Sequence, residues 1–347
     1  MATVWFILLS AMLAAYVVLD GYDLGAGTLH LALARDDAER QLILRAIGPY
    51  WDGNEVWLVA GGGVLFLAFP PVYASAFSGF YLPLMLVLWL LVGRGVALEL
   101  RGQIAMPLWR SFWDAVFCCS SAALALVLGA ALGNVLRGVP LDEHGDFFVP
   151  FWTDFRPSAR PGALDWYTIL IGLLAVAALA SHGAQYLAFK TSGDFQARAR
   201  RLARRWSFVA LALTGAALPA TALVRPDNLA GFRGGPWGPL SFAVALAGWG
   251  VSLRARGRGR DGVAFLGSCA YLGGLFASAA VGLFPYLLPS SGPRELGLTA
   301  PGSAAAASSL KLALAWWIVG VALAVGYFVL VHRTFRGKVE PGGGGYH

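Results

Sequence analysis

Several carboxylate side chains lie within stretches of sequence that are otherwise apolar. Asp20 and Asp23 stand three residues apart, and Asp52 and Glu55 repeat this spacing. Residues three apart on a helix share one face, so each pair would present two acids together. An ionisable group inside an apolar span is costly and suggests a function by default. Such carboxylates could exchange protons near neutral pH, which would suit proton conduction or cation binding.

Further charged residues mark the ends of the neighbouring apolar stretches. Glu99 ends one of them beside Arg94 and Arg101, and Asp114 begins the next. A structural interpretation stays open for each acid. Acids are favourable at a helix N-terminus, so Asp52 could simply cap a helix. Glu99 could form an ion pair with either arginine.

The histidines and cysteines give no pattern typical of a metal site. The five histidines are scattered along the chain. His30 and His182 could in principle be axial haem ligands. A histidine at the end of a span more often makes a hydrogen bond. We therefore expect no metal site in this chain.

Composition then indicates the elements that must position these acids. The chain has 347 residues, of which 58% are hydrophobic and only 13% charged, and its mean hydropathy is +0.64. Soluble globular proteins carry about 25% charged residues. A soluble protein of this size is excluded, because so few charges could not cover its surface. The composition predicts an all-α, polytopic membrane protein.

Helices that cross a bilayer need about 20 apolar residues. The sequence predicts about nine transmembrane helices, which form a single transmembrane domain over residues 1–338. Residues 339–347, rich in glycine, are predicted to be a flexible C-terminal tail. The nine predicted spans cover residues 4–32, 50–70, 73–98, 113–136, 164–187, 206–224, 237–253, 263–287 and 311–332.

Basic residues predict how the spans are oriented. Of the 26 Lys and Arg residues, 19 follow an odd-numbered span and 7 follow an even-numbered one. The positive-inside rule then places the N-terminus outside and the C-terminus in the cytoplasm. The basic pI of about 9.5 is thus a topology signal, and we expect no nucleic-acid partner. At about 1.5 Å per residue, Asp20 lies roughly 24 Å from the outer start of its span. Asp20, Asp52 and Glu99 therefore all fall in the inner half of the membrane.

Several motifs around these acids resemble subunit II of the cytochrome bd quinol oxidase family. Residues 19–25 resemble its DGFDxG segment, residues 51–58 its WDGNEVWL motif and residues 94–101 its RGVAFEFR segment. Residues 182–187 and 284–291 resemble two later segments, so the likeness spans nearly the whole chain. One departure is Ala305, which stands near the place where the family usually has an aspartate.

The resemblance implies an activity for a larger complex. Members of this family belong to an oxidase that oxidises quinol and reduces oxygen to water, with electrogenic turnover. It implies that haem b and haem d are held by the partner, subunit I. It further implies that subunit II has no haem or other cofactor-binding residues and no complete catalytic centre of its own. By the same resemblance, subunit II stabilises subunit I and, in some members, lines a proton channel from the cytoplasm. The motif match assigns the channel to Asp52 and Glu99, with Trp57, Arg94, Asp20 and Asp23 nearby.

The resemblance also implies partners and a location. Some members hold a structural quinone in this subunit, and some complexes include small single-helix accessory subunits. The expected location is the bacterial cytoplasmic (inner) membrane, in contact with lipid and quinol. Two alternatives stay open from the residues themselves. The chain could be a purely structural subunit of the same complex, or an independent cation-coupled transporter.

Overall fold

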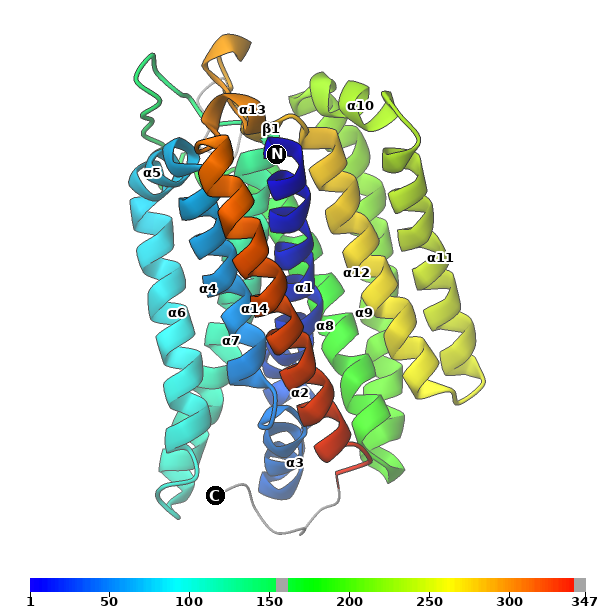
Figure 1. Cartoon of the computed structure of the whole chain (residues 1–347). Helices are drawn as coiled ribbons and strands as arrows, with labels where there is room; N and C mark the ends of the chain where they lie inside the picture. The colour runs from blue at the N-terminus through cyan, green and yellow to red at the C-terminus, as the bar shows by residue number, and fades with distance from the viewer. Residues whose placement is uncertain (154–161, 340–347) are drawn as a thin grey trace.

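The structure is a computed structural model that describes residues 1–153 and 162–339. Long helices run side by side through the molecule, and short elements lie at both ends (Figure 1). The long helices are α1 (Ala2–Thr28), α4 (Trp51–Ala68), α6 (Tyr81–Leu100), α7 (Pro107–Arg137), α8 (Trp166–Lys190), α9 (Gly193–Val224), α11 (Trp237–Gly257), α12 (Asp261–Leu283) and α14 (Ala307–Thr334). The short elements are α2 (His30–Leu33), α3 (Asp37–Ile47), α5 (Pro70–Gly79), α10 (Pro226–Arg233), η1 (Arg294–Leu296), α13 (Ala300–Ser303) and the antiparallel strands β1 (Tyr286–Leu288) and β2 (Leu298–Thr299).

Within the described residues, seven helices are long and apolar enough to cross a membrane. The prediction of an all-α polytopic membrane protein is confirmed, whereas the count of nine spans stays a prediction. The two other long helices, α4 and α11, match the predicted spans 50–70 and 237–253. Each falls outside the seven because polar residues dilute its apolar character. Asp52 and Glu55 lie at the start of α4, and Arg254 and Arg256 lie at the end of α11.

Two element boundaries differ from the predicted spans for identifiable reasons. The stretch predicted as one span over residues 73–98 is divided between α5 and α6, which meet at Phe80. Pro70 starts α5 at its first helical position, where a missing N–H costs nothing. The predicted span 206–224 is the second part of α9, which begins at Gly193. The first half of α9 is rich in alanine and arginine, which are good helix formers, so the helix begins before the apolar stretch.

Helix α1 lies at the centre of the bundle and packs against α4, α7, α8 and α12. Its contact with α8 is backbone against backbone at two glycines. A Cβ on Gly25 would lie 1.9 Å from the carbonyl oxygen of Leu179, and one on Gly183 would lie 2.3 Å from the amide nitrogen of Ala26. Small residues allow this close approach between membrane helices. The contact fixes the face of α1 that carries Asp20 and Asp23.

The two ends of the bundle are distinct. The N-terminus lies at the end that carries α5, α10 and α13, and α14 ends at the opposite end, near α2 and α3 (Figure 1). The turns α8–α9 and α11–α12, both basic, also lie at that second end. Which end faces the cytoplasm stays a prediction. Val339 donates its amide to the carbonyl of Lys190 (2.7 Å), and residues 340–347 of the predicted tail lie outside the described part of the chain.

Candidate functional site

Asp20 on α1 and Arg94 on α6 form a buried ion pair in the core of the bundle. Arg94 Nη1 donates to Asp20 Oδ2 over 3.0 Å, and Nη2 donates to Oδ1 over 2.5 Å. Both residues are fully buried, with an exposed fraction of 0%. Paired parallel hydrogen bonds of this kind are among the strongest that proteins form. The two predicted site residues therefore meet, and they join α1 to α6.

Asp23, less than one turn further along α1, meets an amide instead of a cation. Asn54 on α4 donates from Nδ2 to Asp23 Oδ2 (2.8 Å). The same nitrogen lies 2.7 Å from the Tyr22 hydroxyl and 3.2 Å from the Leu19 carbonyl oxygen. Asp23 and Asn54 are both fully buried. The sequence analysis did not single out Asn54 by itself, although it lies within the WDGNEVWL motif.

Glu55 lies between this buried cluster and the surface. Its Oε2 is 3.8 Å from Arg94 Nη1, and its side chain is 21% exposed. Asn54 and Glu55 are consecutive residues at the start of α4. This short stretch of α4 thus contacts both acids of α1, directly at Asp23 and through Arg94 at Asp20. The three acids thus differ in burial, from half-buried Glu55 to fully buried Asp20 and Asp23.

The remaining predicted site residues lie further out. Asp52 on α4 and Glu99 on α6 are exposed on the surface of the isolated chain. Trp57 packs its ring 5.9 Å from that of Phe328 on α14, and its indole nitrogen is buried without a partner among the described residues. The structure therefore brings together Asp20, Asp23 and Arg94. It leaves Asp52 and Glu99 on outward faces of two neighbouring elements.

A second charged cluster, missed from the sequence, surrounds Asp114 at the end that carries α2 and α3. Asp114 accepts hydrogen bonds from His30 Nε2 (2.6 Å), Arg101 Nε (2.6 Å) and Arg40 Nη1 (3.2 Å). Arg101 also reaches Asp37 (2.6 Å). The proposed pairing of Glu99 with Arg94 or Arg101 is absent among the described residues, because Arg94 holds Asp20 and Arg101 holds Asp114. Spacing alone could not show these contacts, since they join residues far apart in the sequence.

Both histidines considered as haem ligands already make hydrogen bonds within the chain. His30 is fixed by Asp114, and His182 uses both ring nitrogens, with Nδ1 2.7 Å from Ser268 Oγ and Nε2 2.9 Å from the Val18 carbonyl oxygen. Over residues 1–153 and 162–339, no group of three or more His, Cys, Asp or Glu side chains could hold a metal ion.

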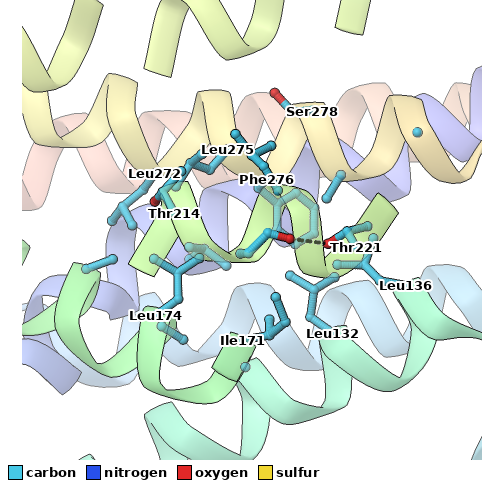
Figure 2. Close-up of a pocket in the computed structure, with 18 of the residues that line it drawn as sticks. Leu132, Leu136, Ile171, Leu174, Thr214, Thr221, Leu272, Leu275, Phe276 and Ser278 are labelled. Atoms are coloured by element: carbon cyan, nitrogen blue, oxygen red, sulfur yellow. Dashed lines mark hydrogen bonds between the residues drawn. The ribbon is translucent and has the colours of Figure 1, made fainter. Parts of the chain in front are cut away.

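An apolar cavity of about 300 Å³ lies between α1, α7, α8, α9 and α12. Figure 2 shows leucine, isoleucine and phenylalanine side chains converging on it from these helices. Two of the hydroxyl groups near it are bonded within the protein, Thr221 to Tyr167 (2.8 Å) and Thr214 to Tyr271 (2.7 Å), whereas the Tyr16 hydroxyl has no partner among the described residues. The cavity suits a hydrocarbon chain better than a polar ligand. Its main lining residues are Leu132, Leu136, Ile171, Leu174, Leu272, Leu275 and Phe276.

The fold and the buried charges define a polytopic helical membrane protein with ionisable groups in its core. Comparison with known families is specific. Residues 1–335 match the family described as cytochrome bd terminal oxidase subunit II. The chain belongs to this family and is a subunit of a quinol oxidase.

Individual relatives agree with this assignment. The chain is 32% identical to the probable cytochrome oxidase subunit 2 of Haemophilus influenzae, with 97% of this chain and 94% of the relative covered. It is 32% identical to the cytochrome bd-I ubiquinol oxidase subunit 2 of Escherichia coli, with 92% and 89% covered. It is 31% identical to the cytochrome bd ubiquinol oxidase subunit 2 of Bacillus subtilis, with 97% and 96% covered.

A solved structure matches the fold over almost the whole chain. It is that of the bd oxidase from Geobacillus thermodenitrificans, with a TM-score of 0.73 and 18% sequence identity, covering 96% of this chain and 98% of the other. The predicted family is confirmed by these matches, and the cation-coupled transporter loses its support. The roles of individual residues are not tested by them.

Proposed function

We propose that this chain is the haem-free subunit of a cytochrome bd-type quinol:oxygen oxidoreductase and that it lines a proton-uptake path from the cytoplasm. One observation carries the proposal. Helices α1, α4 and α6 carry acids that range from exposed Asp52 and Glu99, through half-buried Glu55, to buried Asp20 and Asp23. Ionisable residues in membrane spans typically mark proton relays. The bias of basic residues toward one set of loops supports an entrance to this path on the cytoplasmic side of a bacterial inner membrane.

The larger, haem-bearing subunit I is the partner that would receive these protons. In this proposal haem b and haem d both lie in that partner, and His182 here uses both of its ring nitrogens within the chain. Large apolar side chains are exposed on the same helices as the acids, including Val59 on α4 and Trp89 on α6, which are 74% and 70% exposed. A face of this kind suits contact with another membrane subunit or with lipid. Small single-helix accessory subunits and quinol complete the proposed set of partners.

The apolar cavity is the place we propose for a structural quinone. Its lining fits the isoprenoid tail, because aliphatic and aromatic side chains dominate it. The Thr214 and Thr221 hydroxyl groups at its edge are already bonded to tyrosines, so this part of the cavity fits the tail better than the ring. Leu132 and Leu174 would hold the tail from α7 and α8. The quinone would stabilise the contact between these helices.

Replacing Asp52 by Asn in the assembled complex tests the proton path. We expect quinol-driven oxygen uptake and proton uptake to fall together by roughly a hundredfold or more, as loss of a positioned proton-transferring group implies. The matched control is Asp194→Asn, which removes an exposed acid from the start of α9. Wild-type rates in the Asp52 variant, with intact haem spectra, would contradict the path.

A purely structural role for the acids is the second candidate, and the Asp20–Arg94 ion pair favours it. A buried pair between α1 and α6 would hold the helices together without moving protons. Under this alternative, Asp52→Asn would lose haem or assembly, while each remaining assembled complex would turn over at the normal rate. Turnover per haem therefore separates the two candidates.

A further inference from the structure

Two buried acids of α1 face a single buried cation. Asp20 occupies both terminal nitrogens of Arg94. Within the described residues, no Lys, Arg or His forms an ion pair with Asp23, although Asp23 is 0% exposed. An ionised carboxylate in such a setting is strongly disfavoured unless it is paired. Asp20 therefore has a positively charged partner, whereas Asp23, three residues away, has none among the described residues.

The hydrogen bonds around Asp23 show a shortage of donors. Its Oδ2 accepts one bond from Asn54 Nδ2, and its Oδ1 has no partner among the described residues. The carbonyl oxygen of Asn54, Oδ1, also lacks a donor. The nitrogen of Asn54 cannot supply more, because its two hydrogens already face three oxygens. Buried polar atoms without partners are rare in native proteins and call for an explanation.

We propose that Asp23 is held in its neutral, protonated form in the resting complex, with the proton on Oδ1. A proton there supplies the donor that the two partnerless oxygens lack, since the acid can donate to the Asn54 carbonyl oxygen while the amide donates back to Oδ2. Asp20 stays ionised as the partner of Arg94. The two acids, three residues apart, are thus a fixed charge and a proton holder.

The charged and titratable groups that face Asp23 agree with this assignment. Asp20 on α1 and Glu55 on α4 disfavour a negative charge on Asp23, and Arg94 on α6 favours it. Arg94, however, already carries Asp20 and approaches Glu55 at 3.8 Å. The Tyr22 ring stacks on that of Tyr186 from α8 at 4.1 Å, and neither phenol offers a positive charge. Ionising Asp23 would leave three carboxylates around one guanidinium.

The role of this proton rests on the proposed function, whereas its presence does not. In the proton path, the O–H bond of Asp23 breaks as the proton passes toward the partner subunit. A proton arriving by way of Glu55 then forms that bond again, and no electrons move. Asn54 is the positioning residue, because its amide holds the carboxyl group in place in both states.

Asp23→Asn and Asp20→Asn are the matched variants that test the assignment in the whole oxidase complex. Asparagine copies the shape and neutrality of a protonated aspartate, so we expect Asp23→Asn to assemble at the wild-type yield. Asp20→Asn leaves the Arg94 charge buried and unpaired, and we expect a yield lower by roughly tenfold or more. Equal losses in the two variants would overturn the proposal.

Infrared spectroscopy reads the proton directly. The wild-type complex should show a carboxylic-acid C=O band that shifts in D₂O and on labelling with carboxyl-labelled aspartate, and Asp23→Asn should lose that band. The labelling uses the wild-type protein, so it tests the assignment even if the variant does not assemble. Absence of any aspartic-acid band overturns it. If Asp23→Asn loses the band yet keeps full oxygen uptake, the protonated state is supported and the path through Asp23 is overturned.

Discussion

Arg101 and Asp114 form a two-contact ion pair that closes the turn between α6 and α7. Arg101 Nε lies 2.6 Å from Asp114 Oδ1, and Nη2 lies 3.1 Å from Oδ2. Asp114 is fully buried, and Arg101 is 3% exposed. Through His30 and Arg40 the same carboxylate also holds the segment that follows α1. Asp114 on α7 thus contacts α2, α3 and the residue that follows α6, at the end of the bundle that we assign to the cytoplasm.

Asp114→Asn should therefore destabilise the subunit. Removing one partner of a buried ion pair costs about 3–5 kcal/mol, because the other charges stay buried. We expect a clearly lower melting temperature for the purified complex, measured by loss of the haem-bearing assembly on heating. Asp194→Asn, which removes an exposed acid, is the control and should melt like the wild type. Equal melting of both variants would show that the cluster around Asp114 adds nothing to stability.

Gly25→Ala should disrupt the contact between α1 and α8. The added methyl group would lie 1.9 Å from the Leu179 carbonyl oxygen, which is backbone and cannot rotate away. We expect a loss at or above the ~1–3 kcal/mol usual for overpacking, seen as a reduced yield of assembled complex. Gly62→Ala is the matched control, because nothing lies within 4 Å of its added methyl group. A normal yield of Gly25→Ala would mean that the two helices can separate without loss.

Leu174→Trp should fill the apolar cavity. Leu174 points into the cavity (Figure 2), while its neighbour Leu173 is 47% exposed on the outside of α8. We expect Leu174→Trp to lower the amount of quinone that copurifies with the complex, measured by solvent extraction and mass spectrometry, because the larger ring excludes the tail. Leu173→Trp adds the same side chain outside the cavity and should keep the wild-type content. The same quinone content in both variants would contradict a quinone site here.

The sequence predicted the class of fold and the main elements well, since long apolar runs have few alternatives to a membrane helix. The predicted helix boundaries were wrong at two places where hydropathy alone does not determine where a helix begins or ends. The break between α5 and α6 at Phe80 lies inside a continuous apolar stretch. The early start of α9 at Gly193 lies in a charged stretch that hydropathy leaves out. Local backbone geometry and helix propensity decide both positions.

The candidate site was predicted in part. The spacing of Asp20 and Asp23 indicated that they share one face of a helix, and the structure shows that both are fully buried. Spacing could not show that Arg94 takes Asp20 and leaves Asp23 to Asn54, because that choice depends on how α4 and α6 pack. The cluster around Asp114 was missed for the same reason. Its members come from four separate segments.

The Asp20–Arg94 ion pair also constrains how the chain enters the membrane. Helix α1 is made first and carries a carboxylate, while the guanidinium that neutralises it arrives only with α6. Until both helices are in place, each holds an unmatched charge at a depth where the bilayer opposes it. Both partners of the ion pair thus lie within the N-terminal third of the protein. Its first helix can settle fully in the bilayer only after the stretch up to Leu100 has been synthesised.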